Sequence, residues 1–498
     1  MIQEEVSGSI RNLPWLIWVV VIFGSISSAG FGFDQGWWAA LMSSSQFVHN
    51  FGSLDPVTKT WALSSQQQSL GTGLGYVGVI IGVFGGSPIN ERLGRKNALW
   101  IQSAVVTMGI IIESTARRSY SQFLIGKLFV YLGGGIATSV IPAYQGECAP
   151  KFMRGLMAGT YNAFLMVGGF FATLIVNWAW RVVVVAQIAI PAASWVSLPF
   201  LPESPYWLVS RGRLDEAVIS LRKLRGVSFP AEAEVASMQQ LLEEQRERQT
   251  NATWAICFTD SVNRRRTIIS VGSQIFSQAQ GISFVANYQA LFLQEIGFKE
   301  VLLMSVVVYV IGMAANLIFM ATTDRLGRRN VLLYSSAMLG ACMITIGGLT
   351  ANGPNSMSYE MQVAAVVVLM LWFFTFQVTW GPLAWVLTAE VPPAQVREKT
   401  VALSGLGAYL TGLVIVFVNP FTQADIGGRV AFIYGALSLL SFLFAWVFVP
   451  EVRQRSLEQI DEMFFDKVPT RAFKSHVCRT LEDIAISKGE GVEFVENA

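Results

Sequence analysis

The chain has 498 residues, of which 53% are hydrophobic and 14% are charged, with a formal net charge of +2 and a mean hydropathy of +0.48. A soluble protein carries about a quarter charged residues, so this composition indicates an integral membrane protein in contact with lipid. The small net charge, spread along the chain, excludes a nucleic-acid partner. Two histidines and four cysteines without metal-like spacing exclude a histidine-based metal or catalytic centre, and we interpret the cysteines as free thiols.

Apolar runs of about 20 residues, enough to cross a bilayer, follow one another along the chain. Six precede a polar stretch and six follow it; they lie near 14–41, 69–90, 97–115, 120–144, 156–178, 181–201, 267–293, 301–321, 331–351, 361–389, 399–421 and 428–449. This pattern predicts an all-α membrane protein with twelve transmembrane helices in two six-helix bundles. The predicted parts are an N-terminal bundle (1–202), a cytoplasmic linker with amphipathic helices (203–266), a C-terminal bundle (267–450) and a cytoplasmic tail (451–498).

The orientation follows from the basic residues of the short loops, which gather on the cytoplasmic side of membrane proteins. One side of the predicted topology carries Arg92, Arg95, Lys96, Lys151, Arg154, Arg325, Arg328, Arg329, Arg397 and Lys399. We therefore expect this side, both termini and the linker to be cytoplasmic, in a multi-pass protein.

Three charged signatures occur twice in the same order, which indicates an internal duplication in parallel orientation. An acid-Arg-Leu-Gly-basic run, a Glu-x-x-Pro-x-x-x-Arg run and a Pro-Glu pair recur in each half. Acids and arginines at the helix ends can pair across to the other bundle, hold the cytoplasmic side shut and separate in the other state. The alternative is that the basic loops only set the topology. The predicted gating residues are Glu91, Arg92, Arg95, Glu147, Arg154, Glu203, Asp324, Arg325, Arg328, Glu390, Arg397 and Glu451.

These signatures, with Pro202-Glu203-Ser204-Pro205 and Gly381-Pro382-x-x-Trp385, resemble the sugar-porter branch of the major facilitator superfamily from about residue 25 to 465. Within that branch, the run from Pro393 to Leu403 and Asn162 are most similar to fungal α-glucoside (maltose-type) permeases. The resemblance implies two six-helix bundles with the substrate site between them, near mid-membrane. The plasma membrane is the usual location in this family.

The resemblance also implies which side chains hold a sugar: Asn162, Gln274, Gln278, Ser283 and Trp385. Amides donate and accept, so they match hydroxyl groups, and a tryptophan offers a flat apolar wall to a pyranose ring. The alternative is that these amides only join helices across the bundle. The seventh apolar run departs from the hexose carriers, with Ser283 and Asn287 in place of an Asn and a Tyr, and Ala408 replaces another Asn. A disaccharide, a polyol or a non-sugar metabolite therefore stays open.

Asp34 lies inside the first apolar run, where an acid is costly and therefore a functional candidate. In proton-coupled sugar porters this acid pairs with an arginine on the fourth helix, and this chain has Lys127 at that position. A lysine keeps the charge but lacks the two-pronged geometry of arginine, so we expect a looser pair. The alternative is a solvated, structural Asp34 and facilitated diffusion.

The sequence therefore predicts a secondary active transporter that moves a sugar, an α-glucoside or a hexose, by alternating access with proton symport. The expected partners are a polar solute, a proton and the bilayer. The alternatives are a carrier of a fungal metabolite or aromatic acid, and a non-transporting nutrient receptor. No nucleophile–base pair, metal cluster or phosphate-binding glycine loop is visible in the sequence, so we expect neither an enzyme nor a cofactor.

Overall fold

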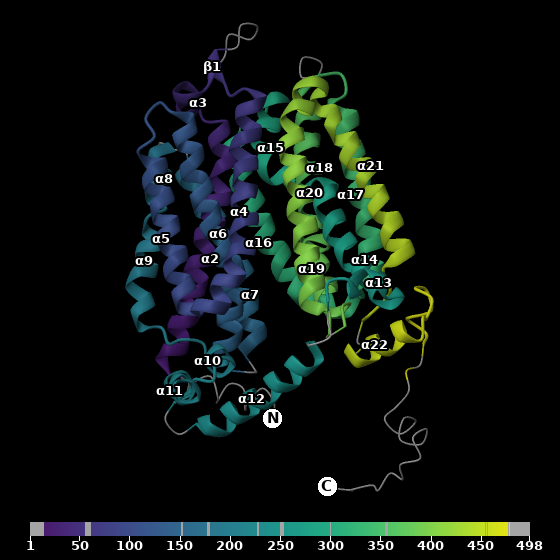
Figure 1. Cartoon of the computed structure of the whole chain (residues 1–498). Helices are drawn as coiled ribbons and strands as arrows, with labels where there is room; N and C mark the ends of the chain where they lie inside the picture. The colour runs from purple at the N-terminus through teal and green to yellow at the C-terminus, as the bar shows by residue number, and fades with distance from the viewer. Residues whose placement is uncertain are drawn as a thin grey trace.

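The computed structural model describes residues 14–478, except 55–60, 151–152, 177–179, 227–228, 250–252, 299, 354–356, 394, 454, 456 and 477. Its helices run side by side in two groups, with the described part beginning in one group and ending beside the other (Figure 1). Each of the twelve predicted apolar runs coincides with a helix or a broken helix. Among the described residues, eight helical stretches are long and apolar enough to cross a membrane, and the longest, Arg397–Phe448, contains two helices.

The N-terminal bundle consists of four long helices, one shorter helix and one broken helix. They are α2 (Trp15–Met42), α4 (Ser65–Leu93), α5 (Arg95–Ser114), α6 (Tyr120–Cys148), α7 (Arg154–Ile175) and the pair α8 (Trp180–Ala186) with α9 (Ala189–Ser197), which the turn η2 (Leu198–Phe200) follows. Local signals set some starts: the Ser64 hydroxyl accepts from the Gln67 N–H at 3.2 Å, and the Gln67 side chain accepts from the Ser64 N–H. This reciprocal cap satisfies donors that the first turn of α4 leaves free.

The C-terminal bundle repeats the arrangement, with two of its passages broken. Its helices are α14 (Ser261–Ser277) and α15 (Ser283–Glu295) joined by the π-helical turn η3 (Gln278–Ile282), α16 (Val301–Leu326), α17 (Arg328–Thr350), α18 (Tyr359–Val378) with α19 (Trp380–Glu390), and α20 (Arg397–Ile426), which the turn η5 (Gly427–Arg429) joins to α21 (Val430–Phe448). Gly281 in η3 has φ +112°, a conformation that L side chains rarely adopt. Helices broken at membrane depth are tolerated where they line a cavity.

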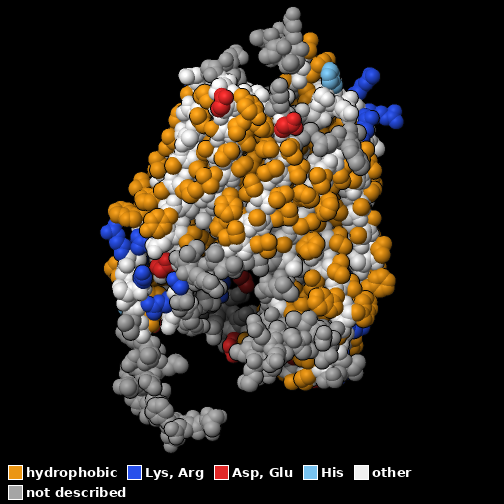
Figure 2. Space-filling model, turned by 180° about the vertical axis from the view of Figure 1, so that it is seen from behind, with side chains coloured by type: hydrophobic (Ala, Val, Ile, Leu, Met, Phe, Trp, Pro, Cys, Tyr) orange, Lys and Arg blue, Asp and Glu red, His pale blue; other side chains and the backbone are white. Residues whose placement is uncertain are grey.

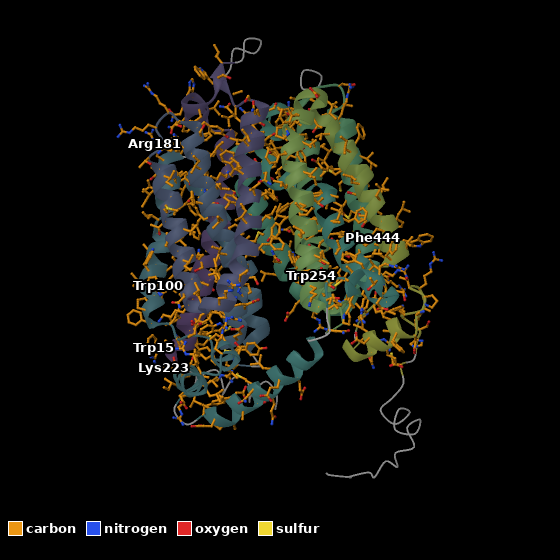
Figure 3. The ribbon with its side chains drawn as sticks, viewed as in Figure 1. Trp15, Trp100, Arg181, Lys223, Trp254 and Phe444 are labelled. Carbon is orange, nitrogen blue, oxygen red and sulfur yellow. The ribbon has the colours of Figure 1, made fainter. Side chains whose placement is uncertain are left out.

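Short elements cover both ends of the molecule. At one end lie α10 (Pro205–Ser210), α11 (Leu214–Arg225), α12 (Ala231–Gln249), α13 (Ile256–Thr259) and α22 (Leu457–Phe465); at the other lie α3 (Ser45–Phe51) and the strands β1 (Ser53–Leu54) and β2 (Trp61–Ala62). We call the first the inner end, because the basic loops predict that it faces the cytoplasm, and the second the outer end. Figure 3 shows Lys223 at the inner end and Arg181 toward the outer end.

The two bundles meet through their outer halves. The Ser69 hydroxyl near the outer start of α4 donates to the Phe417 carbonyl of α20 at 2.8 Å. A Cβ on Gly169 of α7 would lie 2.1 Å from the ring of Tyr309 on α16, so these helices also touch. At the inner end, Figure 2 shows a hollow between the lower parts of the two halves. The structure is therefore closed at its outer end and opens inward.

Glycines let helices of the N-terminal bundle approach closely. A Cβ on Gly82 of α4 would lie 2.1 Å from the Leu132 carbonyl of α6, and one on Gly135 would lie 2.4 Å from the Val79 carbonyl. Membrane bundles use small residues in this way because packing, rather than the hydrophobic effect, holds their helices together.

We expect Gly82→Val to destabilise the N-terminal bundle, because overpacking a tight contact costs about 1–3 kcal/mol. The measurement is the thermal midpoint of the detergent-purified protein. Gly85→Val is the matched control on the same helix, since a Cβ at Gly85 meets no atom within 4 Å. Equal midpoints for the two variants would contradict the packing role of Gly82.

Candidate functional site

A cavity of about 250 Å³ lies between the two bundles. The N-terminal bundle contributes Phe31, Gln35, Tyr76, Val79 and Tyr131, and the C-terminal bundle contributes Gln278, Ile282, Ser283, Ala286, Asn287, Tyr309 and Tyr409. Among these lining residues none is charged, and the polar groups are amides and hydroxyls. We call this the central cavity; its chemistry suits an uncharged solute that carries several hydroxyl groups.

A chain of hydrogen bonds crosses from one bundle to the other at this cavity. The Tyr76 hydroxyl of α4 donates to Ser283 Oγ at 3.3 Å, and Ser283 Oγ donates to Gln278 Oε1 at 2.9 Å. Asn287 Nδ2 donates to the Ser283 carbonyl at 2.8 Å. The π-helical turn brings Gln278 and Ser283, five residues apart, to the same side. A solute that replaced these bonds would contact both bundles at once.

The predicted substrate residues are not all in this cavity. Gln278 and Ser283 line it, but Gln274 is buried between α14 and α19 and donates to Thr388 Oγ1 at 3.3 Å, which fits the alternative of an amide that joins helices. The Trp385 side chain is 49% exposed and does not line the cavity. The Asn162 side chain lies outside the described residues.

The sequence analysis did not predict the aromatic lining: Phe31, Tyr76, Tyr131, Tyr309 and Tyr409. Each of these residues lies in an apolar run, where an aromatic side chain is indistinguishable from a core or lipid-facing residue. A weak signal existed for Tyr76, which glycines flank at positions 75 and 78.

A second feature is a group of ionisable side chains buried in the N-terminal bundle. Asp34 is 2% exposed, and Lys127 and Glu113 are 0% exposed. Gln187 Nε2 donates to Asp34 Oδ1 at 3.4 Å. Lys127 Nζ lies 3.1 Å from the ring centroid of Trp38. In the described part of the chain no ion pair within 4 Å joins Asp34 to Lys127, and Lys127 makes a cation–π contact instead.

Glu113 is the member of this group that the sequence analysis missed. It is the penultimate residue of α5, where an acid looks like an ordinary helix-end charge, but it is fully buried. Both of its carboxylate oxygens lack a hydrogen-bond partner among the described residues, as does Lys127 Nζ. Glu113 and Asp34 both act electrostatically on Lys127. We call Asp34, Lys127 and Glu113 the buried charge cluster.

The buried charge cluster adjoins the central cavity. Asp34 lines a small cavity of about 30 Å³ together with Ser27, Gln102 and Phe31. Phe31 lines both cavities, and Gln35, next to Asp34, lines the central one. Lys127 Nζ lies 5.4 Å from the ring centroid of Tyr131, which also lines the central cavity. The buried charge cluster therefore lies directly behind the wall of the central cavity.

The duplicated signatures form the same network in each half. Arg95 donates to Glu147 through Nη2 at 2.6 Å and Nε at 2.8 Å, and Arg328 Nη2 donates to Glu390 at 3.2 Å. The carboxylate of Glu203 accepts the main-chain N–H of Arg95 at 2.9 Å; that of Glu451 accepts the N–H of Arg328 at 2.9 Å. Each acid thus caps the start of a helix, where anions are favoured. Burial raises the pKa of the Glu203 carboxyl, and these N–H groups oppose that shift.

These pairs lie within a bundle, whereas the sequence analysis expected pairs across the two bundles. The reason is the conformation, which separates the inner ends of the bundles, so each acid meets the arginine of its own half. Glu91 and Arg92 are exposed, and Arg397 Nε donates to the Pro392 carbonyl at 3.3 Å. The side chains of Arg154, Asp324 and Arg325 lie outside the described residues.

Comparison with known proteins gives a consistent picture. The family model for sugar (and other) transporters matches residues 20–464. The chain is 27% identical to the high-affinity glucose transporter ght2 of Schizosaccharomyces pombe, over 96% of this chain and 95% of the relative. It is 25% identical to the major facilitator-type transporter ecdD of Aspergillus rugulosus, over 90% of this chain and 87% of the relative.

Among solved structures, the chain resembles the inward-open xylose transporter XylE of E. coli. The TM-score is 0.73 at 21% identity, over 89% of this chain and 99% of XylE, a protein described as a proton:xylose symporter. This similarity establishes the major facilitator fold, as the resemblance of the motifs implied. The relatives named above include a glucose carrier rather than an α-glucoside permease.

We expect Glu147→Gln to lower stability, because it weakens a largely buried pair with Arg95; breaking buried pairs costs about 3 kcal/mol. The control is Glu216→Gln. Arg213 also donates two hydrogen bonds to the Glu216 carboxylate, but these two side chains are about half exposed. An exposed pair contributes less than about 1 kcal/mol. Thermal midpoints of the purified variants test the difference, and a larger loss for Glu216→Gln would refute the structural role of Glu147.

Proposed function

We propose that this chain, which belongs to the family of sugar (and other) transporters, is a sugar–proton symporter that works by alternating access. The observation that carries the proposal is the central cavity between two bundles that are closed at the outer end and open at the inner end. Its amides and hydroxyls match the hydroxyl groups of a sugar, and its aromatic rings match the apolar face of the ring.

The relatives favour a monosaccharide, because ght2 and ght5 of Schizosaccharomyces pombe are named as high-affinity glucose transporters. We therefore place a hexose before an α-glucoside, although the run from Pro393 to Leu403 keeps the α-glucoside as a substrate to be tested.

The buried charge cluster supports proton coupling through its charge balance. With Asp34 and Glu113 ionised and Lys127 protonated, the cluster carries one net negative charge in a site with little water. Isolated charge in such a site is costly, and one bound proton removes it. Either carboxyl group can carry that proton. The proton site is therefore proposed for Asp34 together with Glu113, beside the wall of the central cavity.

The gating proposal rests on the duplicated networks. Arg95 with Glu147, and Arg328 with Glu390, hold the inner helix ends of each bundle in place. When the inner end closes, the exposed Glu91 and Arg92 approach the other bundle and can pair across it. Such a two-state contact is what alternating access requires.

A second candidate function is transport of an aromatic metabolite. Five aromatic side chains line the central cavity, which suits a flat ring, and the relative ecdD is named only as a major facilitator-type transporter. An anionic aromatic acid fits less well, since the described lining residues include no cation.

The first test is uptake of labelled glucose and maltose by a yeast strain that lacks its own carriers, with and without a protonophore. We expect glucose uptake that a protonophore abolishes. Maltose uptake would move the substrate to the α-glucosides. Uptake of neither sugar by a surface-located protein would contradict sugar transport, and then aromatic metabolites would be assayed.

The second test is directed at the buried charge cluster. Asp34→Asn and Glu113→Gln each remove one acid, so the remaining acid and Lys127 form a cluster that is neutral without a bound proton. Each variant should therefore lose accumulation of sugar against a gradient but keep exchange of sugar across the membrane. The control is Glu360→Gln, an exposed acid at the outer start of α18. Accumulation by Glu113→Gln at the wild-type level would remove Glu113 from the proton site; the same result for Asp34→Asn would remove Asp34.

The third test is directed at the central cavity. Gln278→Ala should weaken sugar binding about tenfold or more, since a lost hydrogen bond to a polar substrate costs about 1–3 kcal/mol. Gln294→Ala, an exposed amide at the outer end of α15, is the control. Binding to the purified protein is the readout, and unchanged binding in Gln278→Ala would place the sugar elsewhere.

A further inference from the structure

A second large cavity lies at the inner end of the C-terminal bundle, away from the central cavity. It has a volume of about 530 Å³. It lies between the start of α17, the residues that follow α21, and the segment that follows α22, which we call the tail segment. Its lining contains five basic side chains and one acid: Arg329, Arg453, Arg455, Arg471, Lys474 and Glu451. We call it the basic pocket.

The one acid of the basic pocket is already engaged. The Glu451 carboxylate accepts the main-chain N–H groups of Arg328 at 2.9 Å, Arg329 at 3.1 Å and Arg453 at 3.1 Å. A carboxylate that binds three N–H groups has little capacity left for the guanidinium and ammonium groups around it. Five cations against one acid leave the pocket with a net positive charge.

Several of these basic groups are anchored by neutral partners. Arg329 Nη2 donates to the Trp446 carbonyl at 2.7 Å, and Arg455 Nη2 donates to the His476 carbonyl at 2.6 Å. Carbonyls fix a guanidinium in place without cancelling its charge. Arg329 and Arg471 also repel each other across the pocket. Positioned cations that repel one another are the arrangement that a multivalent anion relieves.

The basic pocket lies at the border of the lipid-facing surface. The guanidinium of Arg471 is 4.3 Å from the ring centroid of Trp446, which is 44% exposed near the inner end of α21. Val447 and Phe448, the next two residues, are also exposed. Tryptophan marks the interface of a membrane with water. Figure 2 shows the basic side chains of this flank at the lower edge of the hydrophobic surface, and Figure 3 places Phe444 just above on the same helix.

We propose that the basic pocket binds a phosphate-bearing anion and that the phosphate headgroup of a membrane lipid is its source. Arginines bind phosphate through two parallel hydrogen bonds, and Lys474 adds a point charge. The bound phosphate bridges Arg471 and Lys474 of the tail segment to Arg329 at the start of α17. It thereby holds the tail segment against the bundle. This proposal does not depend on sugar transport, because its readout is binding.

The experiment uses the full-length protein in nanodiscs. One arm compares phosphatidylcholine alone with phosphatidylcholine that contains a minor fraction of phosphatidylinositol 4-phosphate. The other arm adds inorganic phosphate to phosphatidylcholine nanodiscs. The readouts are the thermal midpoint and the apparent Kd for each phosphate source. We expect the lipid to raise the midpoint of the wild type and the effect to weaken with added salt.

The test variant is Arg471→Gln combined with Lys474→Gln. Affinity for the lipid should fall about fivefold for each removed charge, and so about 25-fold in all. Lys474→Glu serves as a second variant, because it changes only an exposed side chain and leaves the Arg471–Trp446 contact intact. Arg117→Gln with Arg118→Gln is the control, since it removes two exposed basic side chains from the outer end.

The outcomes separate the possibilities. Lipid binding that both test variants weaken and the control does not would support the proposal. Binding of inorganic phosphate alone would keep the phosphate site and reject lipid as its source. Binding of neither source, or equal binding by the wild type and Lys474→Glu, would overturn it. Sugar uptake is measured in parallel, so a failed transport proposal is recognised separately.

Discussion

The cost of placing charge where there is no water is the constraint on which this structure depends. Most charged residues lie at the ends of the helices, where solvent or headgroups reach them. Among the described residues, Asp34, Lys127 and Glu113 are buried together within the N-terminal bundle. Lys127 rests on the ring of Trp38, which supplies an attractive surface without a negative charge. Because this cluster lies beside the central cavity, we propose that binding of a proton to the cluster affects the cavity.

The proposed response to a proton would pass through side chains that the cluster and the central cavity share. Phe31 lies on the wall of both the small cavity at Asp34 and the central cavity, and Tyr131 faces Lys127 and the central cavity. Movement of either ring therefore alters the space available to a solute. On the opposite wall, Gln278 begins and Ser283 directly follows a turn that departs from the α-helix at Gly281. On that wall, the cavity therefore lies where regular helix is interrupted.

The sequence predicted the architecture well because the constraints on it are strong and repeated. Apolar length and an internal duplication both point to two six-helix bundles, and the fold agrees. Gln278 and Ser283 both line the central cavity, and their binding of a sugar stays a prediction. Other members of the site could not be predicted, since their side chains carry no pattern of their own. Tyr309 looks like any aromatic residue in an apolar helix, and Glu113 looks like an acid at a helix end until the fold buries it.

The sequence also could not predict whether the ion pairs form within a bundle or between the two bundles. Glu147 and Glu390 each have two candidate arginines, one in their own half and one across the interface, and spacing does not choose between them. The conformation of the transporter decides which arginine each acid meets. In a structure that opens at its inner end, the pairs close within each bundle, and this also explains why Glu91 and Arg92 stay exposed.

The duplicated helix caps show where the two halves diverge. Gly94 and Gly327, with φ +96° and +81°, turn the chain so that Glu203 and Glu451 reach the starts of α5 and α17. After Glu203 the chain enters α10, whose Trp207 donates to the Glu91 carbonyl and covers that turn. After Glu451 the chain continues with Arg453 and Arg455, and the tail segment folds back over these arginines. In the first half an indole covers the cap, whereas in the second half the cap forms part of the wall of the basic pocket, where we propose that an anion binds.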